Sequence, residues 1–239
     1  MEETTTTTRA WRMVLERIES DLLEGRLAPG DRLPGERELA SSLGVGRSSV
    51  REALRVLEVM GLIRTGTGSG PTSGAIIIAT PQGGMSTLLR LQVAASGFPL
   101  DDVVSARLVL ECAVVEALAA DSGRSTEAAH AVIEAMDAAD LTPEEFLALD
   151  AQLHLSFAEA SGNVVITAIM AGLRTAIESY IRAGIERIAD WDAEADRLRR
   201  EHRAILAAID AGDPAHARTL VHDHITGYYF DADLSRASH

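Results

Sequence analysis

One stretch of the chain, from Leu33 to Ile63, constrains the fold more than any other part. It reads LPGERELASSLGVGRSSVREALRVLEVMGLI, in which two helical patterns, Glu36 to Ser42 and Ser48 to Val59, flank a glycine-containing turn. The segment from Gly44 to Gly46 supplies the positive backbone angle that such a turn needs. The second helix repeats apolar residues at helical spacing: Val50, Leu54 and Leu57. The pattern predicts two helices crossing at a steep angle, with Ala40 small enough for close approach.

The opposite face of the second helix carries polar and basic side chains: Arg47, Ser48, Arg51 and Arg55. Residues three and four positions apart lie on one side of a helix, so these groups point together toward an external partner. Such a face fits the major groove of DNA, where an arginine donates two hydrogen bonds to a guanine. The competing interpretation is a solvated helix in which the arginines pair with Glu52 or Glu58.

A short strand, a glycine-rich tip and a second strand are predicted directly after this helix. Gly61 ends the helix, and Leu62 to Thr65 is the first strand. The segment GTGSGPTSG then leads to the β-branched run from Ala75 to Ala79. Two helices followed by such a hairpin form a winged helix-turn-helix.

These residues resemble the GntR family of bacterial winged helix-turn-helix regulators, whose heads carry a motif like LPSERELA followed by GVSRxxVREALxxLExxGLI. The resemblance implies a double-stranded DNA operator as partner, with Arg37 contacting phosphate or a base. It further implies that Arg47 and Arg51 contact base edges or nearby phosphates, Ser48 and Ser49 the DNA backbone, and Gly68 and Gly70 the minor groove. Gly46 stands where the family often has Ser or Thr, so that hydroxyl contact to phosphate is missing. Which arginine reads a base stays open.

The composition is typical of a globular protein long enough for two domains, with 239 residues, 46% hydrophobic and 24% charged. No apolar run approaches a membrane span, and the amino terminus lacks the apolar core of a secretory signal. We therefore expect a cytoplasmic protein with no membrane partner, and a disordered leader at residues 1–8. Cys112 is the only cysteine, which excludes an internal disulfide and a thiolate metal cluster.

A net charge of −14 by itself argues against a polyanionic partner, but the charge is unevenly distributed along the chain. Residues 26–64 contain seven arginines and five acidic residues, whereas residues 81–239 contain twelve arginines and twenty-five acidic residues. The negative charge therefore belongs to the second domain. Its repulsion of DNA favours contact through the first domain alone, although salt screens charges beyond about 8 Å.

The rest of the chain is predicted to be helical, which gives a mainly α fold. We expect a winged helix-turn-helix at residues 9–79, a linker at 80–84, an all-helical domain at 85–231 and a tail at 232–239. The predicted helices cover residues 85–96, 102–120, 126–139, 143–160, 164–188, 193–211 and 214–230. Thr142 with Glu145 and Pro143 marks one helix start, and Asp213 with Pro214 marks another. A bundle is the economical arrangement of these helices.

A carboxylate and three imidazoles on the predicted helices form a candidate metal site. Asp150 and His154 lie four residues apart on one helix, which places them side by side. His202 and His224 each share an inward face with apolar residues of their own helices, whereas His222 is rotated toward the polar side. Together the four side chains suit Zn, Ni, Mn or a related divalent ion. Singly, each is explained as well by an ion pair or a hydrogen-bonded core histidine.

The same four positions resemble the FCD effector domain of FadR-like GntR regulators, in which an Asp-x-x-x-His pair, a His in an EHxxI segment and a His in the last helix bind metal. The resemblance implies Asp150, His154, His202 and His224 as ligands of a divalent ion. FCD domains often have an Arg and a Glu in the helix containing Arg107, which implies that this arginine binds the acid group of an effector. An intrahelical pair of Arg107 with Glu111 is the alternative.

The sequence thus predicts a metabolite-responsive DNA-binding regulator, a repressor that senses a small carboxylate effector, such as a hydroxy or sugar acid, at a metal site. A homodimer is implied by the resemblance and by paired operator half-sites. One alternative is a metal-dependent hydrolase, although no HExxH motif or convincing general base accompanies the four residues. The other is a DNA-binding regulator with a purely structural metal.

Overall fold

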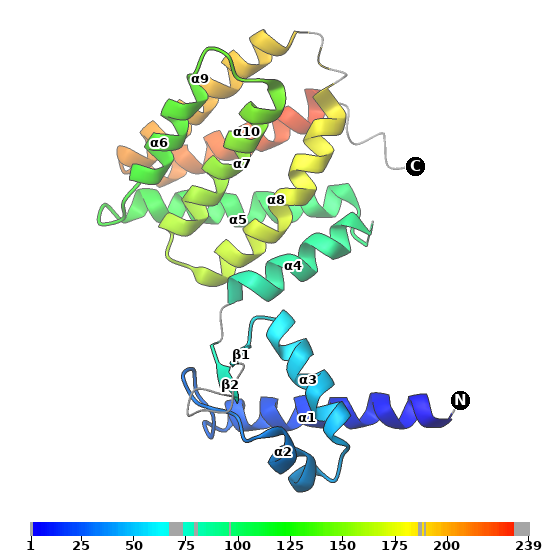
Figure 1. The fold of residues 1–239 in the computed structure, drawn as a ribbon. Helices are drawn as coiled ribbons and strands as arrows, with labels where there is room; N and C mark the ends of the chain where they lie inside the picture. The colour runs from blue at the N-terminus through cyan, green and yellow to red at the C-terminus, as the bar shows by residue number, and fades with distance from the viewer. Residues whose placement is uncertain are drawn as a thin grey trace. The chain divides into compact units, whose positions relative to one another are not determined.

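The computed structural model describes residues 2–66, 74–78, 81–95, 97–185, 188 and 190–231. The chain divides into two compact units, Met1–Met85 and Ser86–His239, and each is described by itself. Both units are built chiefly from helices, and the first adds one two-stranded sheet (Figure 1). The predicted mainly α fold with a small β wing is confirmed. No helix among the described residues is long and apolar enough to cross a membrane.

The first unit packs three helices and a hairpin around one apolar core. Its elements are α1 (Glu2–Leu23), α2 (Glu36–Leu43), α3 (Arg47–Val59), β1 (Ile63–Gly66) and β2 (Gly74–Ile77). Helix α1 lies against α3 and contributes the buried Val14 and Ile18 to the core. The expected disordered leader differs from the structure, in which α1 already begins at Glu2. No helix is predicted for residues 9–23 in the sequence analysis, although Trp11, Val14, Leu15, Ile18 and Leu22 repeat at helical spacing.

The helix-turn-helix follows the sequence pattern closely. Gly44 ends α2 in the left-handed conformation (φ +64°), and its N–H donates to the carbonyl of Ala40. Helix α3 then starts after Gly46, which is extended and has no side chain to cap the helix. The apolar positions predicted to face inward, Val50, Leu54 and Leu57, are all buried. In the turn between α2 and α3, the left-handed backbone conformation that favours glycine is therefore needed at Gly44 and not at Gly46.

We expect Ala40→Leu to destabilise the first unit by about 1–3 kcal/mol, because overpacking of a tight contact forces neighbouring side chains and backbone apart. Ala40 is buried on α2, which contacts α3. Urea unfolding of the full chain measures the effect, with the exposed neighbour Ser41→Leu as control. Equal midpoints for the two variants would show that the helix crossing is not tightly packed.

The hairpin pairs β1 with β2 in antiparallel register, Ile63 opposite Ile77 and Gly66 opposite Gly74. Both isoleucines are buried in the core of the first unit, and Arg32 adds a bridge to Ile76. The predicted strands are thus present, each shifted by one or two residues. The tip at residues 67–73, which includes the candidate DNA contacts Gly68 and Gly70, lies outside the described residues.

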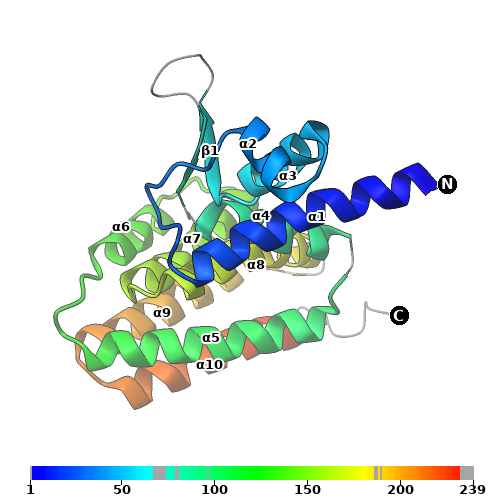
Figure 2. The same cartoon turned by 90° about the horizontal axis from the view of Figure 1, so that it is seen from below.

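The second unit is a helical bundle. Its helices are α5 (Leu100–Ala120), α6 (Glu127–Met136), α7 (Pro143–Ala160), α8 (Val164–Ile185), α9 (Trp191–Asp210) and α10 (Pro214–Asp231), preceded by α4 (Pro81–Ala94) across the unit boundary. Helices α5 and α10 run side by side, and α5 also contacts α7, α8 and α9 (Figures 1 and 2). The predicted linker at residues 80–84 differs from the structure, in which α4 begins at Pro81. Proline is favoured in the first turn of a helix, so Pro81 starts α4 instead of interrupting it.

Local signals in the sequence fix several helix ends of the bundle. Thr142 and Glu145 form the predicted reciprocal cap at the start of α7, with Pro143 in the first turn. The side-chain oxygen of Asn163 accepts from the N–H groups of Val165 and Ile166, so Asn163 caps α8. These caps set the axial positions of α7 and α8 and hence of the side chains they carry.

Candidate functional site

The basic face of α3 is exposed in the first unit. Arg47, Ser48 and Arg55 are exposed on α3, and Arg37 is exposed on α2. Arg51 is exposed too, and its guanidinium pairs with Glu36 at 3.1 Å, so α2 and not α3 supplies its carboxylate partner. This ion pair raises the pKa of Arg51 above its ordinary value through the hydrogen bond and charge of Glu36. The face is therefore formed by α3 together with the start of α2.

Ser49 does not belong to this face. Its side chain is only 5% exposed, because it lies on the side of α3 that carries Val50 and Ala53 into the core. The prediction that Ser49 contacts the DNA backbone is therefore inconsistent with its position. Ser48 is exposed and Ser49 is buried because successive residues point in different directions around the helix. The apolar spacing of α3 did not separate these two neighbouring positions.

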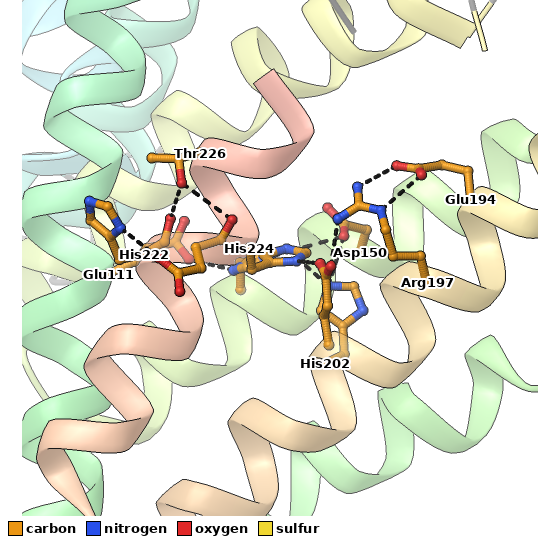
Figure 3. A network of polar contacts seen from close by, with 11 residues as sticks. Glu111, Asp150, Glu194, Arg197, His202, His222, His224 and Thr226 are labelled. Atoms are coloured by element: carbon orange, nitrogen blue, oxygen red, sulfur yellow. Dashed lines mark hydrogen bonds and ion pairs between the residues drawn. The ribbon is translucent and has the colours of Figure 1, made fainter. Parts of the chain in front are cut away.

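The four predicted metal ligands come together inside the bundle. Asp150 and His154 extend from α7, His202 from α9 and His224 from α10, and their donor atoms all lie within 4.8 Å of one another. Nε2 of His224 lies 3.2 Å from Nε2 of both His154 and His202, and Nε2 of His202 lies 3.0 Å from Oδ1 of Asp150. All four are buried, with exposed fractions of 0–4%. Figure 3 shows Asp150, His202 and His224 next to one another.

Apolar neighbours on each helix direct these polar side chains inward. Leu198 and Ile205 bury the same face of α9 as His202, and Ala217 and Val221 bury the same face of α10 as His224. The rival residue His222 is exposed, as its helical position predicted. Burial of the apolar face of each helix thus carries the polar side chains of His202 and His224 into the core, although these side chains alone would prefer water.

Two carboxylates that the sequence analysis did not assign hold the outer nitrogens of two histidines. Glu111 on α5 bonds Nδ1 of His154, and Glu201 on α9 bonds Nδ1 of His224 at 2.8 Å. Both could have been noticed in the sequence, since each lies four residues after an arginine, Arg107 or Arg197. The arginine spacing alone indicates only a helix-surface ion pair, and the pairing with histidine depends on how α5, α7, α9 and α10 pack.

The side chains around the cluster shift the pKa values of the carboxyl groups of Asp150 and Glu111 and of the imidazoles of His202 and His224. Burial opposes ionisation of Asp150, but the hydrogen bond from His202 and the nearby histidines outweigh it and hold its pKa well below the usual range. Burial likewise opposes ionisation of Glu111, yet Arg107 and His154 lower its pKa to about 2. Burial lowers the pKa of His202, and burial together with the other histidines lowers the pKa of His224. Neutral imidazole and ionised carboxylate are the forms that bind metal.

The donor set fits a divalent cation. Three imidazole nitrogens and one carboxylate oxygen suit Zn, Ni or Mn, and the buried negative charge of Asp150 needs a cationic partner. The four side chains thus form a buried His/Asp cluster that could hold a metal ion.

Arg107 lies beside this cluster but is engaged with Glu111. Its guanidinium Nε donates to Oε1 of Glu111, and both side chains are buried. A small cavity borders the pair and is lined by Arg107, Glu111, Ala151, His154, Leu155, Met170, Arg174 and Ile177. Its volume of about 10 Å³ is enough for roughly one water molecule. An organic acid fits there only if the surrounding helices move apart.

Comparison with known proteins agrees with both halves of the structure. Residues 11–72 match the family of bacterial regulatory proteins named gntR, and residues 102–227 match the FCD domain. The "Putative L-lactate dehydrogenase operon regulatory protein" of Escherichia coli K12 is 28% identical over 230 residues, 93% of this chain and 88% of that protein. The regulator LutR of Bacillus subtilis is 28% identical over 208 residues, 84% of this chain and 91% of that protein.

A solved structure, the GntR protein of Streptococcus agalactiae, shares the fold with a TM-score of 0.53 at 24% identity, covering 91% of this chain and 98% of that one. The FCD match alone spans more than half of the chain, and the curated relatives are regulators and not enzymes. The chain therefore belongs to the GntR family of bacterial DNA-binding transcriptional regulators, with an FCD domain as its carboxy-terminal half.

Proposed function

We propose that this regulator senses a small organic acid at a divalent metal site in the bundle and changes its affinity for an operator in response. The observation that supports the proposal is the buried cluster of Asp150, His154, His202 and His224. A bound ion would supply positive charge and coordination positions for a carboxylate or hydroxyl oxygen. The Escherichia coli relative is named for an L-lactate dehydrogenase operon, which is consistent with a hydroxy acid as effector.

The small cavity gives the effector a means of changing the structure. Its lining comes from α5, α7 and α8, and room for about one water does not admit an organic acid. Binding therefore has to select a state in which these helices are farther apart, with Arg107 donating to the acid group. An effector that binds one packing of the bundle better than another shifts the equilibrium between them, which is what coupling to DNA binding requires.

The first unit contacts the operator through α3 in the major groove. In this proposal Arg47 and Arg51 contact base edges or nearby phosphates, Arg37 and Ser48 contact phosphate, and the wing with Gly68 and Gly70 reaches the minor groove. A homodimer places two such units on paired half-sites. We further propose that the protein acts as a repressor that the acid releases from DNA.

A purely structural metal is the second candidate, and one observation favours it. Arg107 is bound to Glu111, and the neighbouring cavity is small, so the described residues that line it leave no preformed space for a carboxylate. In that case the ion would stabilise the bundle without changing DNA binding.

The two functions differ in their response to acids. We expect protein purified without chelator to contain about one divalent ion per chain by elemental analysis. We also expect L-lactate, glycolate or a sugar acid to change operator affinity by roughly 5- to 150-fold, the usual range of allosteric coupling. Fluorescence anisotropy on an operator selected from random DNA measures this affinity. An ion that is present, with no response to any of these acids, would leave only the structural role.

Operator affinity is also expected to fall steeply with salt. Each phosphate neutralised by an arginine releases counterions, so the logarithm of affinity declines with the logarithm of salt by about 0.9 per phosphate contacted. The basic face formed by α3 and the start of α2, which we call the reading face, has four exposed arginines in each chain: Arg37, Arg47, Arg51 and Arg55. A salt titration with the same anisotropy assay measures the slope. A nearly flat response would contradict contact through this face.

A further inference from the structure

Two series of hydrogen-bonded side chains reach the cluster, one starting on α5 and the other on α9, and both contain the same residue types in the same order. In each, an arginine pairs with a glutamate four residues later on the same helix, and the glutamate's second oxygen bonds Nδ1 of a histidine. One series is Arg107, Glu111 and His154, and the other is Arg197, Glu201 and His224. Both histidines direct Nε2 to the centre of the cluster, where these atoms lie 3.2 Å apart.

The two series differ in their access to water. Arg107, Glu111 and His154 are all buried, with side-chain exposures of 3–4%. Glu201 is 30% exposed and Arg197 is 25% exposed. Arg197 also pairs with Glu194 (Figure 3). The second series can therefore be altered by mutation without leaving a deeply buried charge unpaired.

The glutamates determine where each ring carries its hydrogen. An ionised carboxylate only accepts hydrogen bonds, so the histidine nitrogen that contacts it must be the N–H donor. An imidazole that binds a metal keeps its one hydrogen on the other nitrogen, so a hydrogen on Nδ1 leaves Nε2 of His154 and of His224 as the metal-binding atoms. These two Nε2 atoms lie 3.2 Å apart, close enough for one cation to bind both.

His202 has the opposite arrangement. Without an ion, its Nε2, 3.0 Å from Oδ1 of Asp150, carries the hydrogen. Binding a cation through Nε2 moves that hydrogen to Nδ1, which has no hydrogen-bond partner among the described residues. It is therefore the one histidine of the three whose outer nitrogen no carboxylate holds in the described structure.

We propose that Glu111 and Glu201 are positioning residues that fix the Nδ1–H tautomers and ring orientations of His154 and His224, with Arg107 and Arg197 holding the glutamates in place. Arg107 acts on the ion through Glu111 and His154, in addition to any contact with an effector. The proposal rests on the metal-binding part of the proposed function, but the tautomers exist in the metal-free protein and can be measured there.

The first test uses the full-length protein, stripped of metal and labelled with nitrogen-15 in its histidines. In the parent, NMR should show Nδ1–H for His154 and His224 and Nε2–H for His202. Glu201→Ala should move His224 toward the Nε2–H form and leave His154 unchanged. Glu194→Ala is the matched control, because Glu194 pairs with the same Arg197 but contacts no histidine in the described structure. An Nε2–H form of His224 in the parent, or equal spectra for the two variants, would overturn the proposal.

The second test is zinc affinity, measured by competition with a chromogenic chelator. Loss of an outer partner typically weakens metal binding by about 10- to 100-fold, and we expect this for Glu201→Ala, against less than about threefold for Glu194→Ala. Glu201→Gln keeps an acceptor oxygen and should recover most of the affinity. Equal affinities for Glu201→Ala and Glu194→Ala would reject the positioning role, whereas a parent that binds no metal would reject the proposed function and leave the tautomer result standing.

Discussion

The variant His202→Ala is expected to lose at least about 100-fold in zinc affinity, more than the loss of an outer-shell partner costs. His202 is fully buried and contacts both Asp150 and His224 through Nε2, so its removal takes away one donor and leaves Asp150 without its closest partner. Chelator competition measures the affinity. The exposed His222→Ala serves as control, because His222 is a histidine of α10 that points away from the cluster.

The same variant should lose the thermal stabilisation that metal gives the parent. A ligand present at about 1,000 times its dissociation constant stabilises the folded state by about 4 kcal/mol, and this contribution vanishes when the ligand no longer binds. In a domain of this size that is a shift of about 10 °C in Tm. Calorimetry with and without zinc measures the shift for the parent, His202→Ala and His222→Ala. A zinc-dependent shift of equal size in all three would place the ion elsewhere in the chain.

His202→Ala also separates sensing from structure. If an ion at the cluster binds the effector, operator binding by this variant should no longer respond to the acid that changes the parent's affinity. An unchanged response would remove the metal from the mechanism and leave Arg107 and its cavity as the effector site.

The sequence predicted the elements whose signals are local. The apolar spacing of α3, the left-handed glycine after α2 and the cap formed by Thr142 and Glu145 each involve residues within one or two helical turns. The predicted helices of the bundle consequently differ from the observed ones by only a few residues at their ends. Asp150 and His154 were likewise visible as a pair, because they share one helix.

The remaining features depend on contacts between distant elements. Glu111 and Glu201 are ordinary helix glutamates in sequence, and they become partners of His154 and His224 only through the packing of four helices. The ion pair of Arg51 with Glu36 likewise joins two helices, whereas the sequence suggested partners on the same helix as Arg51. The small volume of the cavity beside Arg107 follows from the packing of three helices and has no counterpart in the sequence pattern.

Arg47→Ala and Arg51→Ala are each expected to weaken operator binding by about 10- to 100-fold if the arginine reads a base, and to relax specificity at one base pair. An arginine that contacts only phosphate would weaken binding to all sequences alike. Anisotropy on the selected operator and on single-base variants separates the two cases. Arg203→Ala removes an exposed arginine from the second unit and is the control for loss of charge alone.

The ion pair of Arg51 with Glu36 leads to a prediction about operator affinity when Glu36 loses its charge. Both side chains are partly exposed, and exposed ion pairs contribute little stability, so Arg51 can leave Glu36 for DNA at small cost. Glu36 also places a negative charge at the reading face, where it repels phosphate. Glu36→Gln should therefore leave the fold intact and strengthen operator binding by a few-fold. If this variant instead weakens binding as strongly as Arg51→Ala, then Glu36 orients Arg51 in the complex, and the ion pair belongs to the DNA-bound state.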